Sequence, residues 1–143
     1  MDLPVDAKSL AIGQRVSEYT INYSADHIQG YETAISTREN FHNSSEKARE
    51  SGFAQPFASG TMIVAHTIEN LLPGIFGEGW TKAGSVNAAF IRPILAGSRV
   101  LLAADIVAKL PRGDDTLIVM QLSASLPSGE QLIAGSASAI ARG

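Results

Sequence analysis

The strongest constraint on the fold is a series of long stretches in the second half of the chain where apolar residues recur at every second position. The apolar residues of the two clearest stretches are Val100, Leu102, Ala104, Ile106, Ala108 and Leu110, then Ile118, Met120, Leu122, Ala124 and Leu126. A period of two predicts β-strands with one buried face. Shorter strands are expected at 86–90 and at about 131–141, and turn residues at 93–98, 111–115 and 127–129 separate the strands. Tight connections of this kind predict an antiparallel meander, because parallel strands need long crossovers.

The first half of the chain predicts one further strand and two short helices. Residues 14–23 alternate in part and predict the strand. Residues 25–35 then follow the spacing of an amphipathic helix, with Ser24 as its N-cap. A polar loop at 36–45 and a short helix at 46–50 complete this half.

Residues 61–72 form the most apolar helix that the sequence predicts. Apolar residues occupy most of its circumference, which indicates a buried helix rather than a surface helix. Ser59 and Gly60 precede this helix, and Pro73 with Gly74 is expected to end it. A long helix lying across an antiparallel sheet buries both apolar faces, so we expect an α+β fold with residues 1–143 as one domain.

Composition excludes several classes of protein. Among 143 residues, 11 Lys and Arg stand against 14 Asp and Glu, for a formal net charge of −3, and no basic run suggests binding to nucleic acid. No apolar stretch approaches the ~20 residues that a membrane-spanning helix needs, and we see no signal peptide. Because the chain has no cysteine, disulfides, thiolate metal sites and cysteine nucleophiles are excluded. A cytoplasmic location is compatible with this composition.

Three segments, taken in order, carry a resemblance to a known enzyme family. They are ARESGFAQPFASGTM at 48–62, FIRPILAG at 90–97 and SGEQLIAGSASA at 128–139. Their order and spacing resemble the MaoC-like (R)-specific enoyl-CoA hydratases and dehydratases. The resemblance extends over about residues 16–141. It implies a hot-dog fold, in which a curved antiparallel sheet wraps around a long central helix.

The same resemblance points to a catalytic loop that is incomplete. Counting back from Gly52 without gaps places the family's catalytic histidine at His42. Thr37 then stands where the family has its catalytic Asp, Glu39 where it has Asn, and Asn40 where it has Pro. Deleting one residue aligns Asn40 with the family's Asn, but the Asp is still absent. Glu39 is the carboxylate nearest to His42 in the sequence and is a candidate replacement.

Adding water to a 2-enoyl thioester needs a base for the water, a proton for the α carbon, and donors for an enolate-like oxygen. Imidazole exchanges protons near neutral pH, and the resemblance implies this acid/base role for His42. The backbone N–H groups of Gly60 and Thr61 open the long helix and are candidate donors to the oxygen. The expected catalytic residues are thus His42, Glu39 and Gly60. The expected substrate-binding residues are Asn40, Thr37, Ser59, Thr61 and Arg92, the last for a coenzyme A phosphate.

Each of these residues also has a plainly structural interpretation. His42 could be a solvated loop histidine, and Glu39 and Arg92 could be surface charges. Ser59 could be a routine helix cap, and Asn40 could make a turn.

Other charged and polar residues are interpreted as structural. His66, Glu69 and Asn70 share a helix face without an HExxH pattern, which favours a polar patch at a helix or subunit contact. Asp26 and Glu32 are expected on the solvent side of the 25–35 helix.

The leading hypothesis is a hydratase or dehydratase acting on a 2-enoyl or 3-hydroxyacyl thioester, expected to be linked to coenzyme A, without a metal or other cofactor. The resemblance also implies a homodimer or a higher homo-oligomer. Two alternatives stay open. One is a non-catalytic acyl-thioester-binding subunit of a hot-dog heteromer. The other is a hot-dog enzyme that hydrolyses thioesters or catalyses an unusual elimination.

Overall fold

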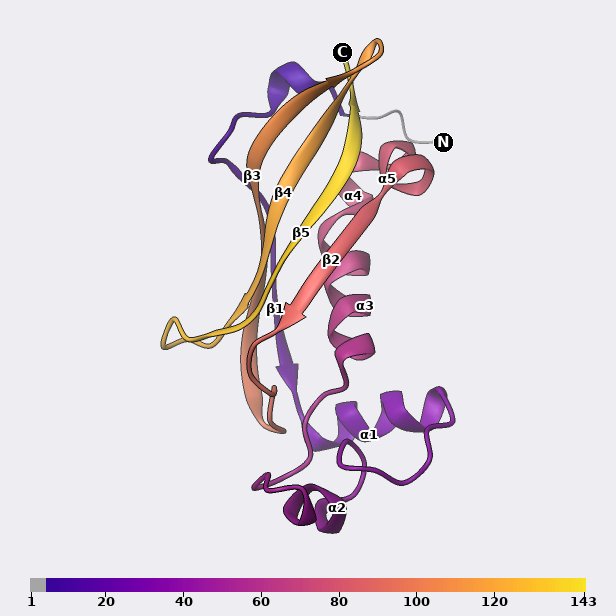
Figure 1. The fold of residues 1–143 in the computed structure, drawn as a ribbon, viewed down its shortest axis with the longest axis vertical. Coiled ribbons are helices and arrows are strands. Elements are labelled where there is room, and N and C mark those ends of the chain that lie inside the picture. Colours follow the sequence, from indigo (N-terminus) through magenta and orange to yellow (C-terminus); the bar gives the residue numbers. More distant parts are fainter. Residues whose placement is uncertain (1–4) are drawn as a thin grey trace.

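A five-stranded antiparallel sheet forms the larger layer of the protein (Figure 1). The computed structural model describes residues 5–143, so residues 1–4 of the expected domain lie outside the described part. The strands are β1 (Arg15–Tyr23), β2 (Ser85–Phe90), β3 (Ser98–Arg112), β4 (Asp115–Ser125) and β5 (Gln131–Arg142). Their order across the sheet is β1-β3-β4-β5-β2.

The meander expected from the sequence is confirmed for β3, β4 and β5, but the position of β2 was wrong. β2 pairs with β5, and β3 pairs with β1 and β4, so the consecutive strands β2 and β3 are not neighbours. The segment between β2 and β3, at 91–97, therefore crosses from one edge of the sheet towards the other. The β3–β4 turn is also tighter than expected, since both strands extend to leave only Gly113 and Asp114 between them.

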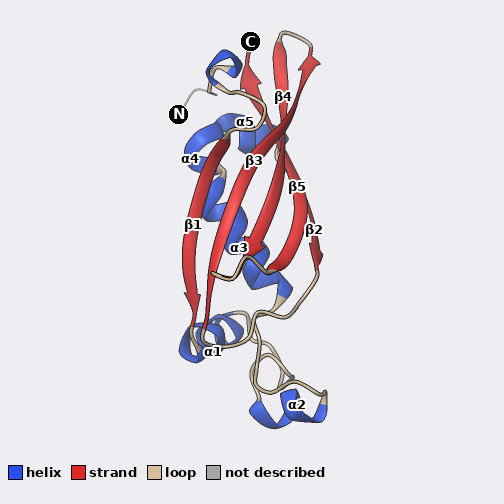
Figure 2. Ribbon diagram, turned by 90° about the vertical axis from the view of Figure 1, so that its left-hand side faces the viewer, coloured by secondary structure: helices blue, strands red, loops and turns tan. Residues whose placement is uncertain are grey.

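Helix α3 (Gly60–Leu71) lies against one face of the sheet, as Figures 1 and 2 show from two sides. Its buried side chains are Met62, Ile63, Thr67 and Leu71, and they join the core formed by the sheet. The expected burial holds for one side of the helix only, because Thr61 and Glu69 are exposed and Val64, Ala65 and Ile68 are only partly buried. This partly uncovered apolar side lines a cleft.

Two shorter helices and a 3-10 turn precede α3 in the chain. Helix α1 (Ala25–Ala34) begins at Ser24, whose side chain accepts the His27 N–H, and α2 (Ser45–Glu50) begins at Ser44 in the same way. Both agree closely with the predicted ranges, and both lie beyond one end of the sheet (Figure 2). A 3-10 turn, η1 (Ala7–Ser9), precedes β1.

Two further helices lie between α3 and β2. Pro73 ends α3 as expected, but it also begins α4 (Pro73–Phe76), and α5 (Glu78–Ala83) follows it. The sequence analysis predicted neither of these two helices, whereas the strand expected at 86–90 is present as β2. Gly79 of α5 packs so closely on the Ile140 carbonyl of β5 that a side chain would not fit there.

Glu32 on α1 contradicts its expected solvent position. Only 1% of the residue is exposed, and within residues 5–143 neither of its carboxylate oxygens has a hydrogen-bond partner. The helical period was interpreted correctly, but it did not reveal which side of the helix is buried. The chain turns directly after α1, where the Thr37 N–H donates to the Glu32 backbone carbonyl at 3.0 Å. Within the described part of the chain, no helix has the length and apolar character needed to cross a membrane.

Candidate active site

His42 is held at the end of the sheet by the segment that leads into α3. Its Nδ1 lies 2.8 Å from the backbone carbonyl oxygen of Phe57. The Phe57 segment is fixed in turn, because Phe57 forms a β-bridge with Leu95 and the Ala58 N–H donates to the Ile94 carbonyl at 2.9 Å. The histidine is therefore positioned by the chain segment that also starts the central helix.

This contact determines which ring nitrogen of the neutral His42 carries the proton. A carbonyl oxygen only accepts hydrogen bonds, so Nδ1 must carry the hydrogen and donate it. The other nitrogen, Nε2, then has a free lone pair and can accept a proton. The arrangement has the form of an oriented general base, in which one ring nitrogen is anchored and the other can react.

Aromatic rings surround the imidazole and limit its movement. The Phe41 and Phe57 rings meet it edge-on, with centroid distances of 4.6 Å and 4.7 Å. Phe41 and Phe57 stack on each other at 5.2 Å, and Phe53 packs against Phe57. These contacts favour one orientation of His42 and place apolar surface beside it.

The N-terminus of α3 offers two uncommitted backbone donors. The Ser59 hydroxyl accepts the Met62 N–H at 3.4 Å, and the Ser59 carbonyl accepts the Ile63 N–H at 3.2 Å. Within residues 5–143, the N–H groups of Gly60 and Thr61 have no such acceptor. Free N–H groups at the positive end of a helix dipole bind a negatively charged oxygen well. Ser59 thus caps the helix, as its alternative structural interpretation held, and this cap leaves the first two donors free.

His42 and the start of α3 line the same cleft, which has a volume of about 830 Å³. Its apolar wall comes from the uncovered side of α3, with Val64, Ala65 and Ile68. Glu69 lines the cleft as well, two turns beyond Thr61. The sequence analysis had assigned Glu69 to a polar contact patch with His66 instead.

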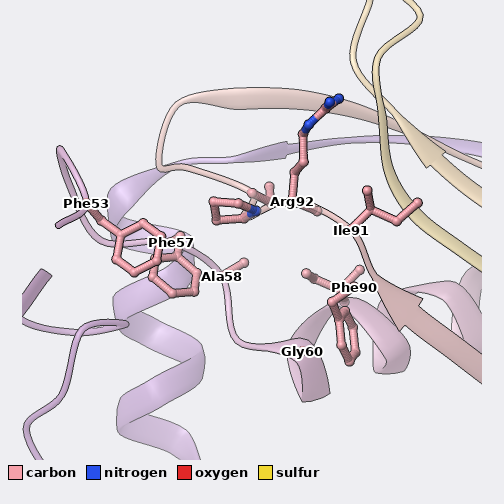
Figure 3. A pocket seen from close by; sticks show the side chains of 10 residues that line it. Phe53, Phe57, Ala58, Gly60, Phe90, Ile91 and Arg92 are labelled. Atoms are coloured by element: carbon pink, nitrogen blue, oxygen red, sulfur yellow. The ribbon is translucent and has the colours of Figure 1, made fainter. Parts of the chain in front are cut away.

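A second cavity of about 350 Å³ shares Gly60 and the Phe90 ring with this cleft. Its other walls include Phe53, Phe57 and Arg92, and Figure 3 shows them around the opening. Arg92 forms an ion pair with Glu130 at 2.8 Å, and both side chains are about half exposed. The Arg92 guanidinium is therefore at the surface but already has one carboxylate partner.

The other predicted residues of the loop have mainly local roles. The Asn40 side chain accepts the His42 N–H at 2.7 Å, and the Asn40 N–H donates to the Asn43 side chain at 2.8 Å, so Asn40 shapes the turn that presents His42. Thr37 is partly buried at the end of α1. Glu39 is exposed, and among residues 5–143 no ion pair or hydrogen bond joins it to His42. The structure thus brings together His42, Ser59, Gly60 and Thr61, but not Glu39.

The remaining two histidines form a separate cluster with Tyr23. The buried Tyr23 hydroxyl lies 3.1 Å from Nδ1 of His66, and the His27 and His66 rings have centroids 5.2 Å apart. Burial, and then the charge of His27, lower the pKa of His66. Burial raises the pKa of Tyr23. This cluster joins β1, α1 and α3, which confirms the expected helix contact for His66.

Among residues 5–143, no group of three or more histidine, aspartate or glutamate side chains is arranged to hold a metal ion. Sequence reasoning missed two members of the site. One is the Phe57 carbonyl that orients His42, and no sequence pattern marks such a backbone contact. The other is Phe90, which could have been singled out because it opens the FIRPILAG segment.

Comparison with known proteins finds similarity at the level of structure. No family model and no curated protein sequence matches the chain. A MaoC-like dehydratase from Rhodospirillum rubrum superposes with a TM-score of 0.79 at 22% identity, covering 96% of this chain and 97% of that protein. The (R)-hydratase from A. caviae involved in PHA biosynthesis gives 0.72 at 17% identity, with coverages of 96% and 100%.

A heteromeric protein is also similar. The C-terminally truncated HadBC complex from Mycobacterium tuberculosis, a 3R-hydroxyacyl-ACP dehydratase, gives a TM-score of 0.69 at 14% identity, covering 90% of this chain and 96% of the other. These similarities extend over nearly the whole chain, and they confirm the α+β fold expected from the sequence. The chain has the hot-dog fold of the MaoC-like dehydratases and (R)-hydratases.

Proposed function

We propose that this protein is a hydratase or dehydratase that adds water to a 2-enoyl thioester, or removes it from a 3-hydroxyacyl thioester. The observation that carries the proposal is the His42–Phe57 hydrogen bond of 2.8 Å, which leaves Nε2 as a free base. That base lines the same cleft as the free N–H groups at the start of α3. A base and an oxyanion site facing one apolar cleft are the parts that this reaction requires.

The proposed steps balance in protons and electrons. Nε2 of His42 takes a proton from water as the water oxygen bonds to the β carbon of the substrate. The electron pair of the double bond moves onto the thioester oxygen, which the Gly60 and Thr61 N–H groups stabilise. The resulting imidazolium then returns its proton to the α carbon. Because one group performs both transfers, H and OH add to the same face of the double bond.

The substrate proposal extends to coenzyme A thioesters. Arg92 is half exposed at the mouth of the smaller cavity and can meet a phosphate if its bond to Glu130 opens. We assign Thr37 and Asn40 to support of the loop rather than to contact with substrate, because their observed hydrogen bonds are local.

The second candidate function is a thioester-binding subunit without activity of its own. It is favoured by one observation, that within the described residues no carboxylate forms an ion pair or a hydrogen bond with His42. Two of the similar structures, HadBC and ChsH1-ChsH2 from Mycobacterium tuberculosis, are complexes of two named components.

Association with a second copy is also part of the proposal, because β2 is an edge strand. The cytoplasmic location stays a prediction.

The test is a hydration assay on the purified protein with short and medium 2-enoyl thioesters, followed by loss of the absorbance of the conjugated thioester. The proposal expects turnover without release of free thiol. Thiol release would indicate a thioesterase instead. Binding without any turnover, measured by calorimetry with a saturated acyl thioester, would favour the binding subunit.

A further inference from the structure

Phe90 occupies a position that affects any ligand reaching the start of α3. Its ring lies against the Gly60 α carbon, so closely that a β carbon on Gly60 would be 2.7 Å from the nearest ring atom (Figure 3). The backbone beneath the ring is fixed, because Phe90 pairs with Ile133 at the end of β2 and the Ile91 N–H donates to the Leu132 carbonyl. Phe90 as a whole residue is more than half exposed.

The same ring also stands between two cavities. It lines the cleft that contains His42 and the smaller cavity that contains Arg92, and Gly60 is the other residue that both share. A ligand with one part in each cavity must therefore cross the start of α3 directly beside Phe90.

The proposed reaction determines which part of the ligand crosses there. With the thioester carbonyl on the Gly60 N–H and the reacting carbons facing His42, the carbonyl and α carbon are the atoms next to the ring. A straight acyl chain can continue along the apolar side of α3, over Val64 and Ile68. A substituent on the α carbon points out of that line, and the exposed ring is the nearest bulky group.

We infer that Phe90 determines substrate specificity by excluding acyl thioesters that carry a substituent on the α carbon. This inference rests on the proposed function, since it needs the thioester carbonyl at the start of α3. Phe90 takes no part in proton transfer. Its effect is steric, and it should separate linear acyl groups from 2-methyl-branched ones.

The chain offers a matched control in the neighbouring residue. Ile91 is 50% exposed, against 54% for Phe90, and it lines the smaller cavity but is not among the residues of the His42 cleft. Ile91→Ala removes a comparable exposed apolar side chain from the same segment without enlarging the space next to the reacting carbons.

The experiment measures kcat/KM for 2-butenoyl and 2-methyl-2-butenoyl coenzyme A with the unmodified protein, Phe90→Ala and Ile91→Ala. A methyl group intrinsically changes reactivity, so the informative quantity is the change in the linear-to-branched ratio between variants. One methyl group in a shaped apolar site typically changes the ratio by about 10-fold or more. We expect Phe90→Ala to lower the ratio by at least about 10-fold, and Ile91→Ala to leave it within about 2-fold. An unchanged ratio in a folded Phe90→Ala protein that still turns over the linear substrate would overturn this inference and leave the proposed function intact.

A binding measurement separates this inference from the proposed function. Dissociation constants of butanoyl and 2-methylbutanoyl coenzyme A should show the same change in ratio, even if no variant has activity. If the binding ratio changes and no variant has activity, the hydratase proposal fails while the steric role of Phe90 stands. Equal binding ratios in all three proteins, or no binding of either thioester, would overturn the inference about Phe90. If Phe90→Ala does not fold, Phe90→Leu provides the same comparison with a smaller expected change.

Discussion

Replacing the buried Glu32 with methionine should make the protein more stable. Glu32 is 1% exposed, and within residues 5–143 both carboxylate oxygens lack hydrogen-bond partners. A buried polar group without a partner loses its hydration and gains nothing in exchange. Methionine has a similar shape and flexibility and an equally good helix propensity, so it can occupy the site without this penalty.

The size of the effect follows from the cost of one unpaired buried group, about 1–3 kcal/mol. For a chain of this length, 1 kcal/mol corresponds to about 3 °C in melting temperature, so Glu32→Met should raise Tm by about 3–9 °C. Glu32→Gln removes the acid but keeps polar atoms in the same place, and it should give a smaller gain than methionine.

Thermal and urea unfolding of the three proteins measure this directly. Glu46→Met is a suitable control, because Glu46 is an exposed glutamate in the first turn of α2 and its loss should cost no more than about 1 kcal/mol. If Glu32→Met instead destabilises the protein by more than about 1 kcal/mol, the reasoning is refuted. The carboxylate would then have a partner that one copy of the chain does not supply.

Three further predictions concern the site and the histidine cluster. Gly60→Ala should lower turnover by about 10-fold or more, because its methyl group would meet the Phe90 ring at 2.7 Å, and adding Phe90→Ala should restore part of the loss in a steady-state assay. Glu39→Gln should leave kcat within about 2-fold, since Glu39 is exposed and does not contact His42 in the described part of the chain; a loss as large as that of His42→Ala would contradict this. Burial lowers the pKa of His66, so the unfolded chain binds the proton more readily and stability should fall as pH drops below about 6.5. In urea unfolding at several pH values, His66→Gln should flatten this dependence of the free energy of unfolding on pH. An identical pH profile in the variant and the unmodified protein would rule out His66 as its source.

Local patterns in the sequence predicted the secondary structure well. Ser24 and Ser44 cap helices as serine does generally, and the alternation in 98–126 produced the two long central strands. The partner of β2 was not predictable in this way, because strand pairing across the sheet depends on how α3 and its connections pack. Helix α5 was missed for a similar reason, since its contact with β5 through Gly79 is a tertiary feature.

The site was predictable only in part. The resemblance pointed to His42 and to the start of α3, and the structure places both on one cleft. Their arrangement depends on the Phe57 carbonyl, which is a backbone atom and has no signature in the sequence. Glu32 shows that a pattern can predict a helix correctly and still misplace one of its side chains. An acidic residue on an amphipathic helix is normally expected in solvent, and only the tertiary structure reveals that this one is buried.

His42 acting as the base is the central claim, and one variant tests it directly. His42→Ala removes Nε2 while leaving Gly60, Thr61 and the apolar wall of the cleft in place. We predict that kcat for hydration of 2-butenoyl coenzyme A falls by about 100- to 10,000-fold, the usual contribution of a general acid/base. His27→Ala, which changes an exposed histidine outside the cleft, should keep most of the activity. A folded His42→Ala protein with unchanged turnover would contradict the central claim.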